Sequence, residues 1–427
     1  MRVFRVIIAA AFFVTLTAGN VFASTLGAAP PKPDAPRLRW KGRTIKLAIS
    51  NSLIRPSTNI KFDSDIMDAV LRSVQAWQNA ADIEIVLEPS DRQSVSPSGL
   101  VGDGVSLITI AQTAENVLLF SKDPEAVSAK TRVFYNAKSF ITEADIVLNP
   151  FQQFSTDGTF GTFDLQSTLT HELGHLLGLR HSSVLGSTMC ESRSKNGAFG
   201  INDLSPRTLA ESDLSSIRDL YGVTGEDSAC CAAIVGRLVV EGSRAVKNVR
   251  VWAEEGRTGR VVAQVEAAGD GSFRLGGLPE ATYSVFWEKK DDGTGVSFGE
   301  LGPAAVVKGR TVELDDKILL RHSEIELDYL GINSQLADSA LPLTAGRQYV
   351  LYLGGKGLDA KGLNVVFNSP YFKVAGQSSA HQDFGEGISV ITVILTVDQN
   401  APAGAYSIFA ARADGSISSM IGALNID

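Results

Sequence analysis

The chain has 427 residues, which is too many for one compact core, because domains usually hold about 100–200 residues. We therefore expect about two to four domains. The apolar fraction of 44% and the charged fraction of 20% are ordinary for soluble globular proteins and exclude wholesale disorder. The formal net charge of −8 argues against nucleic acid as a partner, since phosphate binding needs clustered Lys and Arg.

The N-terminus carries a predicted signal peptide, residues 1–23. Arg2 and Arg5 form a basic region, and residues 6–18 are apolar but too few for a comfortable membrane span. The small Ala23 predicts cleavage before Ser24; the alternative is a retained membrane anchor. No later stretch is long and apolar enough to span a bilayer. We therefore expect a protein secreted from the cell or exported to the periplasm, with no membrane span after signal removal.

The next part of the chain is predicted to be one mixed α and β domain, residues 40–223. It is preceded by a linker or short propeptide at residues 24–39, which is rich in Ala and Pro. Asp63 or Ser64 is the expected cap of its first helix, and Asp164 precedes the second. Apolar patterns predict strands at residues 44–50, 83–87, 105–110, 132–135 and 145–148, and helices at residues 63–79, 165–177 and 211–221.

After residue 225 the pattern changes to short strands separated by turn signals, and no convincing helix follows Ile234. Strand-like runs include residues 238–240, 249–252 and 261–265. This spacing predicts two β-sandwich modules, residues 224–321 and 322–427. The expected fold class is therefore multidomain: an α+β domain followed by two all-β sandwiches.

One stretch, HELGHLLGLRH, carries most of the functional signal. His171 and His175 lie one turn apart, so a helix can aim both at one ion. Gly178 lets the chain leave the helix, after which His181 can return to the metal. Three protein ligands leave a fourth position for water, as a catalytic zinc site requires. Glu172 can take the proton of that water and pass it to the departing amine.

The spacing argues against chance, because the chain has only 5 His residues and three of them fall in this stretch. A zinc site kept for structure alone is the alternative. Such a site usually has four protein ligands, and Cys190 is the one nearby candidate for a fourth. The pattern therefore favours one catalytic Zn²⁺.

The stretch resembles the zinc signature of the metzincin metalloproteases. Met189 resembles the methionine turn that these enzymes place beneath the metal, and the Ser after the third His is similar to the matrixin branch. ADIVLN at residues 144–149 and LSSIRDLYG at residues 214–222 extend the likeness over residues 40–223.

The resemblance implies a zinc endopeptidase with His171, His175 and His181 as ligands, Glu172 as general base and Met189 as a packing platform. It also implies a protein or peptide substrate that lies extended along the edge strand of the sheet. No His precedes His171, so the second, structural zinc of animal matrix metalloproteases is not expected. No Cys precedes Cys190, so their cysteine latch is absent too. Ca²⁺ is common in the family, but no ligand pattern assigns it here.

The later modules resemble known β-sandwich domains. Residues 234–288 resemble a carboxypeptidase regulatory-like domain, which implies a sandwich without catalytic chemistry, and residues 324–427 resemble a bacterial immunoglobulin-like module. We expect these modules to position the substrate or to hold the enzyme near a surface or matrix. His322 and His381 have no second ligand at metal spacing and are expected on the surface or in loops. The acidic pairs at residues 291–292 and 315–316 are expected to be solvated loop charge rather than calcium ligands.

Three Cys residues leave one thiol over after a disulfide. We expect Cys190 to pair with Cys230 or Cys231. Two other functions stay open: an adhesion or binding protein whose metzincin domain has little activity, and a zinc hydrolase of another amide, such as one in a cell wall. The intact Glu172 argues against the first, since a scaffold needs no base, and the matrixin-like flanks favour peptide bonds over the second.

Overall fold

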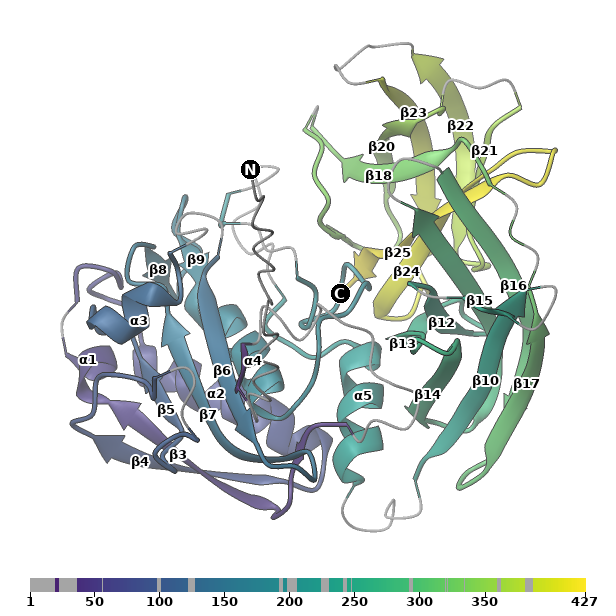
Figure 1. Cartoon of the computed structure of the whole chain (residues 1–427). Coiled ribbons are helices and arrows are strands. Elements are labelled where there is room, and N and C mark those ends of the chain that lie inside the picture. Colours follow the sequence, from purple (N-terminus) through teal and green to yellow (C-terminus); the bar gives the residue numbers. More distant parts are fainter. Residues whose placement is uncertain are drawn as a thin grey trace, which may run out of the picture.

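The structure is a computed structural model, which describes residues 20–22, 37–55, 57–97, 101–121, 127–191, 195–197, 206–223, 230–240, 244–246, 248–291, 295–318, 320, 322–333, 335–358, 362–380 and 387–427. Apart from the backbone of residues 20–22, the expected signal peptide lies outside these residues. Two lobes stand side by side (Figure 1). The first holds the helices of the described residues, and the second is built of strands. None of the described helices combines the length and apolar character needed to cross a bilayer.

A seven-stranded sheet forms the base of the first lobe, in the order β1-β6-β7-β5-β3-β4, with β2 paired to β7. The strands β4, β3, β5 and β7 run parallel to one another, whereas β6 is antiparallel to β7. The strand β1 pairs with β6 and comes from the expected signal peptide, so its removal would leave β6 as the edge. The strands are β1 (Asn20–Phe22), β2 (Arg39–Trp40), β3 (Thr44–Ser50), β4 (Glu84–Ser90), β5 (Leu107–Thr109), β6 (Ala129–Tyr135) and β7 (Phe140–Leu148).

Helices pack against this sheet through apolar faces. Val70, Val74 and Trp77 are buried on α2, and the indole of Trp77 donates to the carbonyl of Thr170 at 2.8 Å. Asp65 caps α2 by accepting from the Asp68 amide, so the predicted cap at Asp63 or Ser64 is wrong. The bounds are α1 (Asn51–Ile54), α2 (Ile66–Ala80), α3 (Ala114–Leu118), α4 (Leu165–Leu176) and α5 (Glu211–Tyr221), with short strands β8 (Phe154–Ser155) and β9 (Phe163–Asp164) before α4.

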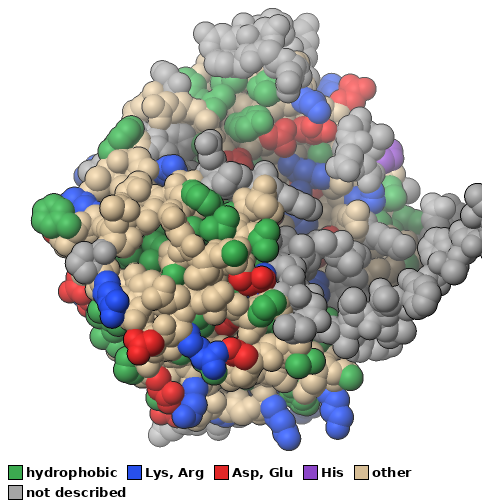
Figure 2. Space-filling view, turned by 60° about the vertical axis from the view of Figure 1, so that its left-hand side comes forward, with side chains coloured by type: hydrophobic (Ala, Val, Ile, Leu, Met, Phe, Trp, Pro, Cys, Tyr) green, Lys and Arg blue, Asp and Glu red, His purple; other side chains and the backbone are tan. Residues whose placement is uncertain are grey.

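Asp63 instead forms an ion pair with Lys61 at 3.2 Å. The expected α4 and α5 agree closely with the structure, and Asp164 caps α4 by accepting from the Ser167 amide at 2.7 Å. Figure 2 turns the first lobe forward, and charged side chains of both signs mix along the lower part of that face.

The second lobe contains two pairs of four-stranded sheets. The first sheet pair has the orders β11-β10-β14, with β17 beside β10, and β13-β12-β15-β16. Its two sheets share an apolar core that includes Ile234, Val251, Phe273 and Trp287. Its strands are β10 (Ala232–Val240), β11 (Arg244–Ala245), β12 (Arg250–Glu255), β13 (Val261–Glu266), β14 (Ser272–Leu278), β15 (Ala281–Asp291), β16 (Gly295–Val306) and β17 (Thr311–Lys317).

The second sheet pair has the orders β18-β20-β23-β22 and β19-β25-β24-β21, around a separate core that includes Leu327, Leu353, Ile408 and Leu424. As predicted, no helix follows Ile234 among the described residues. The strands of this pair are β18 (Glu326–Gly331), β19 (Leu341–Leu343), β20 (Gln348–Lys356), β21 (Asn364–Val366), β22 (Phe372–Ala380), β23 (Ile388–Val397), β24 (Gly404–Ala411) and β25 (Ile417–Ile426).

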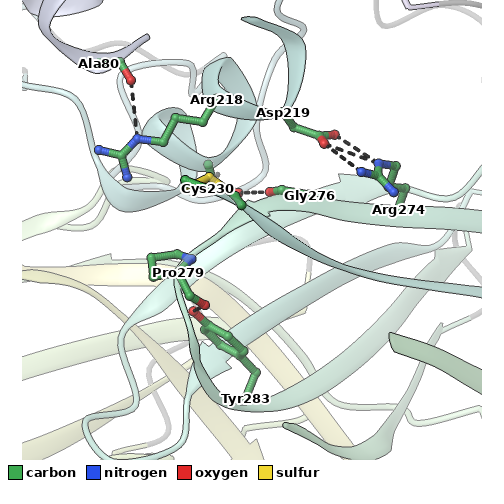
Figure 3. The surroundings of a disulfide bond; sticks show 10 residues. Ala80, Arg218, Asp219, Cys230, Arg274, Gly276, Pro279 and Tyr283 are labelled. Atoms are coloured by element: carbon green, nitrogen blue, oxygen red, sulfur yellow. Dashed lines mark hydrogen bonds and ion pairs between the residues drawn. A yellow bond between two sulfur atoms is a disulfide. The ribbon is translucent and has the colours of Figure 1, made fainter. Parts of the chain in front are cut away.

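The helix α5 joins the lobes by packing on β14. Its Ser215 hydroxyl donates to the carbonyl of Gly276 at 2.6 Å, and a methyl group at Gly277 would overlap the Ser215 carbonyl. Asp219 pairs with Arg37. It also pairs with Arg274 of the second lobe at 3.1 Å, as Figure 3 shows. The lobes therefore meet through close backbone contact and an ion pair between the mostly buried Asp219 and the exposed Arg274.

The structure corrects the cysteine pairing. The disulfide joins Cys230 to its neighbour Cys231, while Cys190 is buried elsewhere (Figure 3). Cys190 lies near the start of α5, because it follows Met189, whose amide donates to Asp213 in the first turn of that helix. Cys230 and Cys231 line a cavity at the other end of α5. At 1.5 Å per residue, the helix separates these sites by about 12 Å, whereas a disulfide holds Cα atoms within about 7 Å.

Candidate metal centre

The three histidines of the sequence motif come together at the C-terminal end of α4. His171 and His175 are buried on the helix, which ends at Leu176. Gly178 then adopts a φ of 95°, and a methyl group there would overlap the carbonyl of Leu38. The turn brings His181 back, so that the Nε2 atom of His175 lies 3.0 Å from that of His171 and 3.1 Å from that of His181.

Backbone carbonyls fix the protonation of two of these rings. The Nδ1 atom of His171 lies 2.8 Å from the carbonyl of Thr188, and that of His175 lies 2.9 Å from the carbonyl of Leu179. A carbonyl can only accept, so each Nδ1 carries a hydrogen, and in the neutral ring the Nε2 atom then presents a lone pair. Two lone pairs facing each other at 3.0 Å repel, and a shared cation would turn this repulsion into attraction.

The spacing of the nitrogens suits zinc. Three imidazole nitrogens on bonds of 2.0–2.1 Å at tetrahedral angles would lie about 3.3 Å apart, close to the 3.0 and 3.1 Å found here. Among the described residues, this is the group of His, Cys, Asp or Glu side chains whose ligand atoms converge. The cluster could therefore bind a metal ion.

Glu172 lies beside the cluster and is held in one orientation. Its side chain is buried, and its Oε2 atom accepts a hydrogen bond of 2.6 Å from the hydroxyl of Thr131 on β6. The same hydroxyl lies 3.2 Å from the Glu172 carbonyl. Sequence reasoning did not select Thr131, because a single Thr in a strand carries no signal of its own.

Met189 packs directly against α4, below the histidines. A methyl group at Gly174, between His171 and His175 in sequence, would overlap the Met189 sulfur and approach Trp77 to 2.9 Å. The small residue therefore lets Met189 and Trp77 reach the helix backbone. This contact explains why a glycine occupies position 174 of the motif.

Asp213 in the first turn of α5 holds the segment that contains Met189. Its carboxylate accepts from the Ser187 hydroxyl at 2.5 Å and from the amides of Thr188 at 2.8 Å and Met189 at 3.2 Å. It also accepts from the Ala210 amide, and burial raises its pKa although these hydrogen bonds oppose the shift. Since the Thr188 carbonyl contacts His171, Asp213 supports a proposed ligand indirectly. Asp213 belongs to no motif that would have pointed to this role.

The other candidate residues lie apart from this cluster. His322 is exposed, and His381 lies outside the described residues. Asp315 and Asp316 belong by their backbone to β17, and Asp291 ends β15; their side chains, and residue 292, are not described. Their roles stay predictions, as does any Ca²⁺ site.

Comparison with known proteins supports the motif. The matrixin family model matches residues 119–222, which include the three histidines, Glu172 and Met189. This part of the chain is therefore similar to the matrixin family. It is also 45% identical over 65 residues to metalloendoproteinase 1 of Glycine max, a match that covers 14% of this chain and 18% of that enzyme. The chain thus spans less than a fifth of the length of this curated relative.

The solved structures that match this chain do so with low TM-scores. BcpA, the major pilin subunit of Bacillus cereus, is 14% identical with a TM-score of 0.19, covering 44% of this chain and 66% of that chain. A putative adhesin from Bacteroides ovatus is 12% identical with a TM-score of 0.18, and the match covers 48% of this chain and 90% of the adhesin chain. Overlap at this level assigns no shared fold or function.

Proposed function

We propose that this protein is an exported zinc-dependent endopeptidase, in which His171, His175 and His181 hold one Zn²⁺ and Glu172 is the general base. The observation that carries the proposal is the convergence of the three Nε2 atoms beside a buried, oriented carboxylate, within the residues that match the matrixin family. A structural zinc would usually need a fourth protein ligand. The three-histidine set instead suits an ion that keeps one position for water.

The donor set fits zinc chemically. Neutral imidazole is the commonest metal ligand, and hydrogen bonds from Nδ1 to carbonyls orient the ring and raise the basicity of Nε2. His171 and His175 both have such a bond. When bound, zinc would supply Lewis acidity toward the scissile carbonyl and lower the pKa of a water molecule at the open position.

Glu172 then handles the proton. Its carboxylate would take a proton from the attacking water and deliver it to the nitrogen of the departing amine. Thr131 fixes one carboxylate oxygen at 2.6 Å, so this transfer would occur from a single, prearranged orientation. Burial of Glu172 limits competing contacts with solvent.

The strand β6 is the proposed support for the substrate. Thr131 lies on β6 and contacts Glu172, so the strand passes beside the centre. In the structure β6 already pairs antiparallel with residues 20–22, Val21 standing opposite Val133. Signal removal would free this edge for another extended segment. These contacts support a substrate of exposed, extended polypeptide.

The proposed location is outside the cell or in the periplasm, as the expected signal peptide implies. The resemblances of residues 234–288 and 324–427 to carboxypeptidase regulatory-like and immunoglobulin-like modules stay predictions, as does their contact with a surface or matrix. The domain limits 40–223, 224–321 and 322–427 are likewise proposals.

The test is cleavage of unfolded casein by the purified mature chain, with the zinc content of each sample measured. Glu172→Ala should keep its zinc, because the three histidines remain, and should lose about 10²–10⁴-fold in kcat/KM. Glu88→Ala is the matched control, since Glu88 pairs with Lys46 at the surface of the sheet. If the wild type holds zinc but cuts nothing under conditions where a known metzincin cuts casein, the proposal fails and a binding role takes its place.

A further inference from the structure

The loop between His181 and Met189 has both ends at the proposed metal centre. We name residues 182–188 the ligand loop. The amide of Ser182 donates to the carbonyl of Met189 at 2.8 Å, which closes the loop at its base. A displacement of the loop would therefore be felt at His181 on one side and Met189 on the other.

The tip of the ligand loop forms hydrogen bonds with the second lobe. The amide of Leu185 donates to the carbonyl of Ile421 at 2.9 Å, and that of Gly186 donates to the carbonyl of Gly422 at 3.0 Å. Both carbonyls belong to β25, in the second sheet pair. Figure 1 shows β25 reaching the centre of the molecule, where the two lobes meet.

Val184 enters an apolar socket formed by both sheet pairs. It is fully buried in a cluster with Trp252 and Phe286 of the first pair and Phe409 and Ile421 of the second. The socket is shaped for it, because Gly422 has a φ of 61° and a methyl group there would overlap a Val184 methyl. A residue of the first lobe thus completes the core between the two sheet pairs.

A second contact lies next to the proposed ligand. Gln264 on β13 accepts from the amide of Ser183 at 3.2 Å and lies 3.4 Å from the hydroxyl of Ser182, the residue after His181. Whereas Asp213 of the first lobe holds the Met189 end of the loop, Gln264 and the Val184 socket hold the His181 end from the second lobe.

We propose that the second lobe is a working part of the metal centre: Val184 and Gln264 are positioning residues that hold the third metal ligand, His181, in place. This inference rests on the proposed function, since it takes His181 as a ligand. Without the second lobe the loop would gain conformational freedom that metal binding must then remove. Groups that orient metal ligands commonly change metal affinity by about 10–100-fold.

The test uses the full mature chain with Val184→Asp, which places a charge in the socket. Leu353→Ala is the matched control, because Leu353 is buried in the core of the second sheet pair, away from the ligand loop. Two quantities are measured: hydrogen exchange of the Leu185 and Gly186 amides, and zinc affinity in competition with a chelator. V184D should lose amide protection and bind zinc about 10–100-fold more weakly. L353A should lower the melting temperature and change neither quantity.

A second pair of variants approaches the socket from β25 and serves if V184D does not fold. Gly422→Ala would displace Val184, whereas Gly387→Ala matches its backbone strain at a φ of 75° with no neighbouring atom to meet. G422A, but not G387A, should reproduce both losses. The inference is overturned if a variant loses amide protection but binds zinc as tightly as the wild type. It is also overturned if both V184D and G422A keep the amide protection of the wild type. A wild type that binds no zinc would instead defeat the proposed function.

Discussion

Glu254 makes the junction of the two sheet pairs sensitive to pH. The carboxyl group is buried on β12, and it accepts from the Trp252 indole at 3.0 Å and from Ser407 at 2.6 Å and Asn368 at 3.0 Å in the second sheet pair. Burial raises the pKa of Glu254 from 4.5 to about 7, against the opposing effect of these hydrogen bonds. The folded protein therefore keeps a proton that the unfolded chain releases above its ordinary pKa.

The sign and size of the effect follow from this difference. Stability falls as the pH rises from about 4.5 to about 7, because over this range the unfolded state ionises and the folded state does not. At 1.36 kcal/mol for each pH unit, the whole loss is about 3 kcal/mol. Above pH 7 both states are ionised and Glu254 adds no further slope.

Glu254→Gln removes the titration while keeping an acceptor of similar shape. We expect urea unfolding of the second lobe to show that the wild type loses about 2–3 kcal/mol more than E254Q between pH 5 and pH 8. Glu300→Gln, on the exposed side of β16, is the control and should follow the wild type. Equal pH slopes in the wild type and E254Q would refute the reasoning.

Two further predictions concern the proposed metal centre. Gly174→Ala should overpack the contact with Met189 and Trp77 and destabilise the first lobe by about 1–3 kcal/mol. Thermal unfolding tests this, with Gly269→Ala as the control, because a methyl group at Gly269 meets no neighbouring atom. Equal melting temperatures for the two variants would contradict the prediction. Thr131→Val keeps the shape of the side chain but removes the donor to Glu172, so kcat should fall about 10–100-fold with zinc content unchanged. Steady-state kinetics with a metal assay tests this, and wild-type kcat would show that Thr131 does not orient the base.

The convergence of the three histidines could be predicted because the information for it lies in one short stretch of sequence. Helix periodicity and the Asp164 cap place α4 within a residue of its observed end, and the spacing of the motif brings His171, His175 and His181 together. The short helices α1 and α3 were missed because four or five residues contain too little periodicity to separate a helix from a turn.

The contacts between distant segments could not be predicted in the same way. Neither Val184 nor Gln264 belongs to a motif, and their importance appears only when β25 and β13 lie beside the ligand loop. The expected pairing of Cys190 failed for the same reason. A disulfide from Cys190 to Cys230 or Cys231 was expected to tie the histidine motif to the end of the first domain. In the structure, Cys190 and the Cys230–Cys231 pair lie at opposite ends of α5.

The contact of the ligand loop with β25 also orders events during synthesis. Leu185 and Gly186 leave the ribosome long before Ile421 and Gly422, the residues whose carbonyls they meet. Contacts so distant in sequence form late, after the segments nearer in sequence have folded. The first lobe can thus assemble its sheet and α4 while the segment after His181 still lacks its final support. The ligand loop therefore reaches its final position only after the second lobe has folded. The histidine motif is thus synthesised some time before the geometry of the proposed metal centre is complete.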